Sequence, residues 1–375
     1  MIRPRVLFLI DQLKSVGGAE RALMRLTAAL AERDTFVSVV TLGDRVSPEL
    51  NDWFPCEAHA LGLFRTYDFD SLRKAVVLRS LIKRMEINIV STYFESSDLW
   101  GAPIAKLCGC KVVSCRRDMG ILRQSKHKVA YRFASRIFDR VVAVSDEVRH
   151  WTIRADALPP HKILTIHNGV PIPKAAGKAR SHSEFKMPPT AFVITMVGNV
   201  RPEKGTDVLV RAAEQVCTKL PNARFLVVGG VANERYAEHV SESIAKAGLT
   251  DKIVFSGHQE DVTSILRMSD LFVLPSRSEG FSNALLEAMA VGLPCVATRV
   301  GGNSEALGTA GVLVDTEDAT GLAFELIHLG QDADLRSRLG AAARLRAEAN
   351  FSVDAMANKM LAAFYEVLND GVEGR

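Results

Sequence analysis

Short apolar runs alternate with helical stretches along the whole chain. The apolar runs predict strands over 6–10, 37–41, 87–92, 112–114 and 141–145 in the first half, and over 192–197, 224–228, 253–255, 271–274, 295–298 and 312–314 in the second. Helical spacing of apolar residues occupies the intervals, for example over 72–85, 102–108, 125–138 and 207–219. This alternation predicts parallel sheets with helices on both faces, the doubly wound α/β class.

The length of 375 residues is more than one hydrophobic core organises and suits two domains. We expect a first domain over 1–173, a linker over 174–190 that Pro and Gly punctuate, and a second domain over 191–350. The remaining segment, 351–375, predicts a helix with one apolar face. That face is formed by Val353, Met356, Met360, Leu361, Phe364 and Leu368.

Two carboxylates flank a short turn that opens a predicted helix. Glu279 is followed by Gly280, Phe281, Ser282 and Asn283, the helix is expected from Ala284 to about Val291, and Glu287 lies inside it. A helix that begins at the carboxyl end of a strand directs unpaired N–H groups and a partial positive charge at that point. This favours an anion site with a carboxylate on either side. The alternative is an ordinary capped helix, with Ser282 as cap and Glu279 as a solvated charge.

Two cations follow the predicted strand 192–197. Gly198 and Asn199 begin a loop that holds Arg201 and Lys204 and ends at Gly205. A planar guanidinium and a point-like ammonium three residues apart suit a diphosphate. An ordinary basic loop is the alternative, but ligands of open α/β sheets bind beyond the carboxyl ends of the strands, where both motifs fall. A Gly-x-Gly-x-x-Gly fingerprint with a downstream acid is missing, which counts against a nicotinamide enzyme.

These motifs resemble those of a known family. The pair Glu279 and Glu287, the loop from Arg201 to Gly205 and an N-terminal Gly17-Gly18-Ala-Glu are similar to retaining glycosyltransferases of family 4. The resemblance covers nearly the whole chain. It implies the GT-B fold, in which two Rossmann-like domains face a cleft, and it implies that the segment 351–375 packs back on the first domain.

The resemblance also implies a metal-independent, retaining hexosyltransferase without a cofactor. Its donor substrate would be a UDP- or GDP-linked sugar and its acceptor a glycan or a lipid-linked saccharide, as in cell-envelope or exopolysaccharide synthesis. The implied donor-binding residues are Gly17, Gly18, Gly198, Asn199, Arg201, Lys204, Gly280, Phe281, Ser282, Asn283 and Glu287. Arg201 and Lys204 would neutralise the diphosphate, Glu287 would bind the ribose, and Glu279 would orient the transferred sugar as a catalytic residue. A carboxylate nucleophile is the alternative for retention, whereas this family is usually described by a same-face mechanism.

The chain departs from the family after the predicted strand 112–114. Many relatives carry a His there, often followed by Asp, whereas this sequence has Arg117 followed by Asp118. Asp118 is the second candidate catalytic residue. An arginine cannot imitate a neutral imidazole, so either the donor sugar is recognised differently or the arginines serve the acceptor.

Composition narrows the class further. Hydrophobic residues make up 47% and charged residues 24% of the chain, values typical of a globular protein. Apolar runs stay well short of the ~20 residues that a membrane span needs, and the run 6–10 is followed by Asp11, unlike a signal peptide. We therefore expect a cytoplasmic protein. The six cysteines have no Cys-x-x-Cys pair and predict reduced thiols without a structural metal.

Charge is distributed unevenly between the two halves. Residues 1–180 hold 29 Lys and Arg against 18 Asp and Glu, whereas residues 181–375 hold 18 against 25. A basic set in the first half is a candidate acceptor or membrane patch: Arg116, Arg117, Arg123, Lys126, Lys128, Arg132 and Arg136. Further basic residues cluster over 73–84. One hypothesis is docking on an anionic inner-membrane surface, and the alternative is a solvated basic face; nucleic acid is not an expected partner.

Two rival functions remain. A GT-B nucleotide-sugar epimerase or a phosphorylase would also need a phosphate pocket, although a pyridoxal phosphate enzyme would need a committed lysine that the sequence does not reveal. A catalytically silent scaffold is the other rival, and the joint presence of Arg201, Lys204, Glu279 and Glu287 argues against it.

Overall fold

The computed structural model describes residues 2–13, 17–46, 51–120, 125–174 and 177–370, with the backbone alone for 125–129. The chain forms two compact units. Unit 1 consists of residues 1–169 together with 353–375, and unit 2 of residues 170–352.

Unit 1 is built on a parallel sheet with the strand order β3-β2-β1-β4-β5-β6-β7. The strands are β1 (Arg5–Ile10), β2 (Phe36–Thr41), β3 (Ala58–Ala60), β4 (Ile89–Tyr93), β5 (Lys111–Arg116), β6 (Arg140–Ala143) and β7 (Ile163–Thr165). The helices are α1 (Gly18–Ala31), α3 (Phe69–Arg84), α4 (Ala102–Leu107), α5 (Ser125–Ala134), α6 (Asp146–Asp156) and α14 (Val353–Asn369), with a π-helical turn η1 (Ser97–Gly101) and a 3₁₀ turn η2 (Pro160–Lys162).

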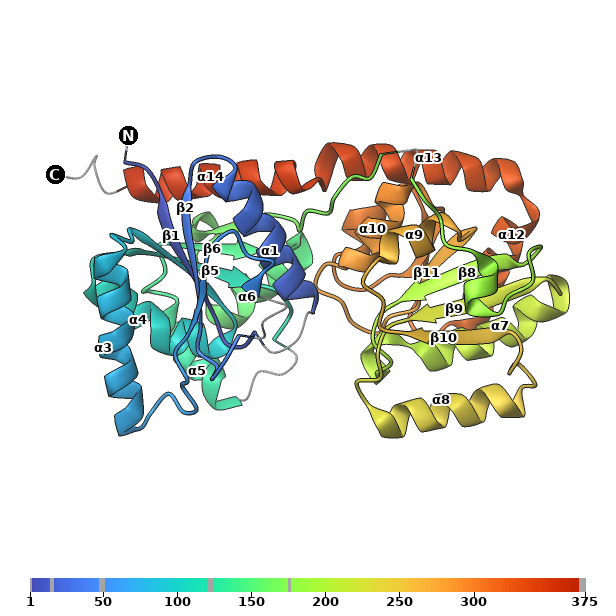
Figure 1. The fold of residues 1–375 in the computed structure, drawn as a ribbon, viewed down its shortest axis with the longest axis horizontal. Coiled ribbons are helices and arrows are strands. Elements are labelled where there is room, and N and C mark those ends of the chain that lie inside the picture. The colour runs from blue at the N-terminus through green and yellow to red at the C-terminus, as the bar shows by residue number, and fades with distance from the viewer. Residues whose placement is uncertain (1, 14–16, 47–50, 121–124, 175–176, 371–375) are drawn as a thin grey trace. The chain divides into compact units, whose positions relative to one another are not determined.

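Alternate residues of the central strand β1 face opposite sides of the sheet, as the period of a strand requires. Phe8 belongs to a core that α1 and α14 complete, and its ring lies 6.3 Å from that of Phe364. Leu9 points the other way and packs closely against Gly101 at the end of η1. A Cβ placed on Gly101 would lie only 2.1 Å from Leu9 Cδ2. Helices therefore cover both faces, and the first and last helices, α1 and α14, pack side by side (Figure 1).

Unit 2 repeats the scheme with the parallel order β10-β9-β8-β11-β12-β13. The strands are β8 (Phe192–Val197), β9 (Ala223–Val228), β10 (Ile253–Gly257), β11 (Leu271–Leu274), β12 (Cys295–Thr298) and β13 (Val312–Val314). The helices are α7 (Thr206–Lys219), α8 (Glu234–Lys246), α9 (Val262–Arg267), α10 (Asn283–Val291), α11 (Asn303–Leu307), α12 (Ala319–Gln331) and α13 (Ala333–Asn350), with 3₁₀ turns η3 (His182–Phe185) and η4 (Pro202–Lys204).

The segment expected as a linker, 174–190, is packed on unit 2 where the structure describes it. Phe185 and Met187 are buried, and the backbone N–H of Arg180 donates to the carbonyl of Ser264 at 3.1 Å. The segment is mostly polar and is punctuated by one glycine and two prolines, but its two buried apolar side chains pack it within unit 2. The described part of the chain contains no helix long and apolar enough to cross a membrane.

Candidate active site

Both second-half motifs lie at the carboxyl ends of two neighbouring strands. β8 leads into Gly198 and the cation loop, β11 leads into the carboxylate loop, and the two strands are hydrogen-bonded to each other. They form the point of the sheet where the strand order changes direction, because β9 lies on the far side of β8 and β12 on the far side of β11. Ligands of doubly wound sheets bind outside this point.

The cation loop and the carboxylate loop meet in a direct ion pair. Lys204 Nζ lies 2.7 Å from Glu279 Oε1, and the Oγ of Ser276 donates to the same oxygen at 2.7 Å. The exposed fractions of the Lys204 and Glu279 side chains are 15% and 9%. Arg201 is different, because its side chain is 49% exposed and its ion pair with Glu203 is long, at 3.8 Å. The site therefore combines a held cation with an exposed one.

Two glycines allow the loops to approach so closely. Gly205 has φ +68°, and a Cβ there would lie 2.0 Å from the carbonyl oxygen of Pro275. Gly301, in the loop after β12, has φ +51°, and a Cβ there would lie 1.8 Å from the carbonyl oxygen of Glu279. A left-handed backbone disfavours a side chain, and a contact this close excludes one. Gly302 N–H also donates to Gly280 at 3.0 Å.

The helix that follows Glu279 begins at Asn283, one residue before its expected start. Ser282 is the N-cap of α10, and its Oγ accepts from Leu285 N–H at 3.4 Å. The Phe281 ring is buried and packs edge-on against Phe351 at 5.4 Å, so its side chain serves the core. Asn283 is the first residue of α10, and Glu287 is half-buried one turn further along it.

The remaining donor candidates of unit 2 stabilise the turn after β8. The N–H of Gly198 donates to Val228 at 2.8 Å, and a Cβ on Gly198 would lie 3.3 Å from Lys204 Cδ. Asn199 Oδ1 accepts from Gly230 N–H at 3.2 Å. These contacts fix the path of the loop that leads to Lys204.

In unit 1 the predicted glycine site already holds a carboxylate. The N–H of Gly17 donates to Glu20 Oε2 at 3.0 Å, at the start of α1. Burial raises the pKa of Glu20, while its hydrogen bonds and the nearby Arg117 act in the opposite direction. An external anion bound at Gly17 would have to replace this internal acceptor. The role of Gly17 and Gly18 remains a prediction.

The carboxyl edge of the first sheet contains a residue that the motifs did not indicate. Asp11 follows β1 directly and accepts hydrogen bonds from Ser96 N–H at 3.0 Å and Ser97 N–H at 2.8 Å, after the neighbouring strand β4. Phe94, the residue directly after β4, adopts a left-handed φ of +73°. This conformation is often found at functional sites. An acid directly after a buried strand is the signal that would have found Asp11.

One predicted patch residue is in the wrong place for its role. Arg116 is 5% exposed and forms ion pairs with the buried carboxylates Asp98 and Asp156, because β5 ends inside the unit. Its guanidinium also stacks on the ring of Tyr131 at 4.4 Å. Arg116 therefore stabilises the core of unit 1 and cannot contact an acceptor or a membrane.

The other residues of this stretch are more accessible where they are described. Arg117 Nη2 donates to Asn168 Oδ1 at 2.6 Å, and the exposed Asp118 accepts from Gly120 N–H at 2.6 Å. Arg132 is exposed on α5, and Arg136 is exposed in the turn just after it. Arg123 lies outside the described residues, as do the side chains of Lys126 and Lys128. The catalytic role of Asp118 stays a prediction.

A cavity of about 680 Å³ lies elsewhere in unit 1. Its lining includes Lys111, Asp139 and Lys162, which stand at the amino ends of β5, β6 and β7. The candidate residues of both units lie at the carboxyl ends of their strands. This cavity is therefore separate from the candidate active site.

Comparison with known proteins assigns the family. Residues 16–173 match Glycosyltransferase Family 4, and residues 178–346 match Glycosyl transferases group 1. The lipopolysaccharide core biosynthesis mannosyltransferase LpsB of Rhizobium meliloti is 31% identical over 254 residues, which cover 65% of this chain and 70% of that enzyme. The chain belongs to these glycosyltransferases.

Two further comparisons span almost the whole chain. The N-acetyl-α-D-glucosaminyl L-malate synthase of Bacillus anthracis is 26% identical over 377 residues, covering 96% of this chain and 97% of the enzyme. HepE of Anabaena, solved in complex with UDP and glucose, has a TM-score of 0.83 at 21% identity and covers 97% of this chain and 100% of its own. The likeness shows the fold: the two parallel α/β units are those of GT-B glycosyltransferases.

Proposed function

We propose that this glycosyltransferase moves a sugar, with retention of configuration, from a UDP- or GDP-linked donor to a saccharide or lipid-linked saccharide acceptor. The observation that carries the proposal is the contact between Lys204 and Glu279. It lies between β8 and β11, where the strand order in the sheet of unit 2 changes direction. A cation and a carboxylate held together there suit a ligand that carries both a diphosphate and sugar hydroxyls. The complex of HepE with UDP and glucose supports this donor class.

In the proposed reaction, the bond between the sugar C1 and the diphosphate oxygen breaks while a bond from C1 to the acceptor oxygen forms on the same face. The acceptor proton passes to the departing diphosphate. Lys204 and Arg201 would stabilise the negative charge that grows on the diphosphate, and Glu279 would orient the sugar through its hydroxyls. These cations would supply the electrostatic stabilisation without a metal ion or another cofactor.

The proposed setting is the assembly of an envelope or exported polysaccharide, which the similarity to a lipopolysaccharide core mannosyltransferase supports. The acceptor would then lie at an anionic membrane surface, and unit 1 offers a surface that fits. We define the α3 surface by its exposed apolar and basic residues: Phe64, Tyr67, Phe69, Leu72, Val76, Arg73, Arg79, Lys83 and Arg84.

The α3 surface combines two features of a membrane-docking helix. Phe69 is 88% exposed and Leu72 is 65% exposed on the outer face of α3, and Tyr67 before the helix is 81% exposed. Basic residues alternate with them at helical spacing. Apolar side chains that enter the headgroup region beside lysines and arginines are typical of helices that bind anionic membranes. Arg132 on α5 and Arg136 just after it would extend the same attraction.

The test of the proposed function is a panel of UDP- and GDP-linked sugars offered with saccharide and lipid-linked saccharide acceptors. Transfer to an acceptor with an unchanged anomeric configuration, followed by nuclear magnetic resonance, would support the proposal, and full activity in a chelator would support the metal-independent step. Inversion would remove the same-face mechanism. Epimerisation or phosphorolysis of the donor without transfer would replace the proposal by one of the rival functions.

A further inference from the structure

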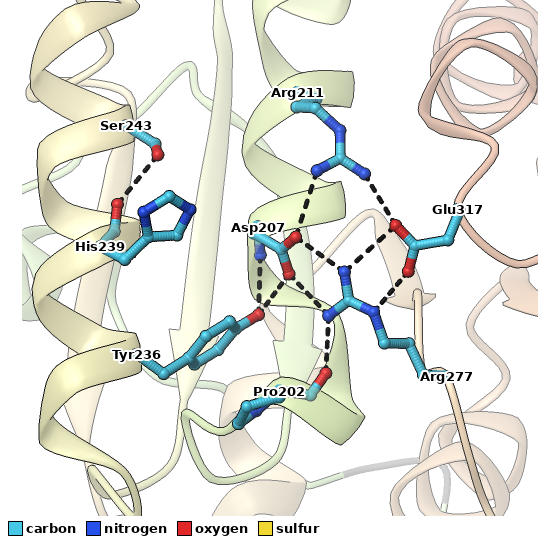
Figure 2. Close-up of polar contacts among 8 residues, drawn as sticks. All are labelled: Pro202, Asp207, Arg211, Tyr236, His239, Ser243, Arg277 and Glu317. Carbon is cyan, nitrogen blue, oxygen red and sulfur yellow. Dashed lines mark hydrogen bonds and ion pairs between the residues drawn. The ribbon is translucent and has the colours of Figure 1, made fainter.

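Arg277 connects the two loops of the candidate site. It lies in the loop after β11, two residues before Glu279. Its backbone N–H donates to the carbonyl of Glu203 at 2.8 Å, and its Nη1 donates to the carbonyl of Pro202 at 2.7 Å. These are the two residues immediately before Lys204. One residue of the carboxylate loop therefore holds the backbone that carries the cation (Figure 2).

The guanidinium of Arg277 is itself fixed from two sides. Nη1 and Nη2 donate to the two oxygens of Asp207, in the first turn of α7, at 2.8 and 2.7 Å. Nε and Nη2 donate to the two oxygens of Glu317, in the loop before α12. Paired contacts of this kind between arginine and carboxylate define the orientation as well as the distance. The hydroxyl of Tyr236 donates to Asp207 and so connects α8 to the same cluster.

This geometry distinguishes a positioning role from a binding role. A guanidinium has five N–H donors, and those of Arg277 are all engaged, by Pro202, Asp207 and Glu317. The Arg277 side chain is 31% exposed. Its charge is compensated by two carboxylates, so it has no donor left for a phosphate.

A neighbouring residue provides a matched control. Arg211 donates to Asp207 and to Glu317, at 3.1 Å each, and so shares both carboxylates with Arg277 (Figure 2). It lies on α7, its side chain is 50% exposed, and its hydrogen bonds in the described structure do not reach the cation loop. The two arginines differ in their contact with the backbone before Lys204.

We propose that Arg277 is a positioning residue of the donor site, which holds Lys204 in the place where it meets both Glu279 and the donor diphosphate. The inference rests on the proposed function and adds a residue that acts through Lys204. Without the guanidinium, the turn from Arg201 to Gly205 would lose the side-chain hydrogen bond to Pro202 and would depend on the backbone contact of Glu203 alone, so the ammonium would be held less firmly.

The first experiment measures binding by calorimetry for the parent, Arg277→Gln, Arg211→Gln, Lys204→Ala and the double variant of Arg277 and Lys204. UDP and GDP are compared with uridine and guanosine. Arg277→Gln is expected to weaken binding of the matching diphosphate by roughly tenfold, as for the loss of one charge-assisted contact, with nucleoside binding unchanged and Arg211→Gln close to the parent. The double variant should bind no more weakly than Lys204→Ala, because both changes remove the same interaction.

Three results would overturn the inference: parent-like diphosphate binding in Arg277→Gln, an equal loss in Arg211→Gln, or independent losses that multiply in the double variant. If Arg277→Gln does not fold, Arg277→Lys is measured in its place, and it should lose diphosphate affinity while keeping nucleoside affinity.

A second measurement separates this inference from the proposed function. Hydrogen exchange of the backbone over 201–205 is followed in the ligand-free parent, Arg277→Gln and Arg211→Gln. Faster exchange in the Arg277 variant alone would support positioning even if the parent binds neither UDP nor GDP, a result that would remove the proposed donor. Unchanged exchange would overturn the positioning role.

Discussion

Lys204 and Glu279 are 75 positions apart in the chain, and their side chains meet at 2.7 Å. The contact joins the loop after β8 to the loop after β11 and leaves the ammonium only 15% exposed. A charge held this way would need little rearrangement to meet the proposed diphosphate, which is the condition for electrostatic stabilisation of a departing group.

Removing either cation should weaken diphosphate binding. Lys204→Ala and Arg201→Ala are each expected to cost about 1.5–3 kcal/mol of binding free energy, the range for a hydrogen bond to a charged group. The Lys204 variant should lie at the upper end, because it also leaves Glu279 without its cation. Calorimetry with UDP and GDP measures the loss. If both variants bind as the parent does, the cation loop is not the diphosphate site.

The two carboxylates should separate kinetically. Glu287→Gln is expected to raise KM for the donor with little change in kcat, because its proposed contact is with the ribose. Glu279→Gln is expected to lower kcat at saturating donor, because its proposed contact is with the sugar that reacts. Initial rates over a range of donor concentrations distinguish the two. A loss confined to KM in both variants would remove Glu279 from the catalytic residues.

Gly205 should tolerate no side chain. Gly205→Ala would place a Cβ 2.0 Å from the Pro275 carbonyl, and Gly248→Ala is the control, because Gly248 has nearly the same φ, +67°, with nothing within 4 Å. The control should cost about 1–2 kcal/mol for the left-handed backbone alone, and Gly205→Ala should cost more and also weaken donor binding. Equal costs and unchanged donor affinity would show that the loops need not approach so closely.

The three tryptophans, at positions 53, 100 and 151, all belong to unit 1. Tryptophan fluorescence therefore follows the unfolding of unit 1, and circular dichroism follows both units. If a substitution destabilises unit 2 alone, its unfolding transition should shift when followed by circular dichroism and stay unchanged when followed by tryptophan fluorescence.

Asp207 should make the stability of unit 2 sensitive to acid. Burial raises its pKa, but hydrogen bonds from Arg277 and Tyr236 outweigh this, and the pKa lies well below its ordinary value. Its contribution to stability is therefore complete above the unfolded pKa, about 3.9, and is lost as the pH falls below it. Urea unfolding at pH 6 and pH 3, followed by circular dichroism, should show a larger fall in the midpoint for the parent than for Asp207→Asn. The same fall in both would contradict this role.

The α3 surface should bind anionic membranes. Co-sedimentation with vesicles is expected to require anionic lipid and to weaken with salt. The variant with Arg73, Arg79 and Lys83 changed to Ser should bind about 100-fold more weakly, at ~1 kcal/mol per basic residue. Phe324→Ser removes an exposed aromatic residue from unit 2 and is the control. Binding that ignores lipid charge, or an equal loss in the control, would favour a soluble acceptor.

Periodicity was enough to predict the doubly wound fold, and the resemblance of three motifs to family 4 predicted the glycosyltransferase family. The predicted strand 271–274 coincides with β11, and 192–197 with β8, because buried strands of a parallel sheet are continuous apolar runs that few other elements produce. The stripe that includes Met356 and Phe364 is buried on α14. The edge strand β3 is missed because its three residues include one histidine and no apolar run.

Long-range packing decided the contacts that the site depends on. Arg116 and Arg117 are adjacent in a basic stretch, yet Arg116 is buried between Asp98 and Asp156 while Arg117 reaches Asn168, because neighbouring residues at the end of a strand point in opposite directions. Arg277 shows no sign of its role in the sequence, since its partners Pro202, Asp207 and Glu317 lie at least 40 positions away. Spacing along a chain records local geometry, whereas contacts between loops depend on which strands become neighbours in the sheet.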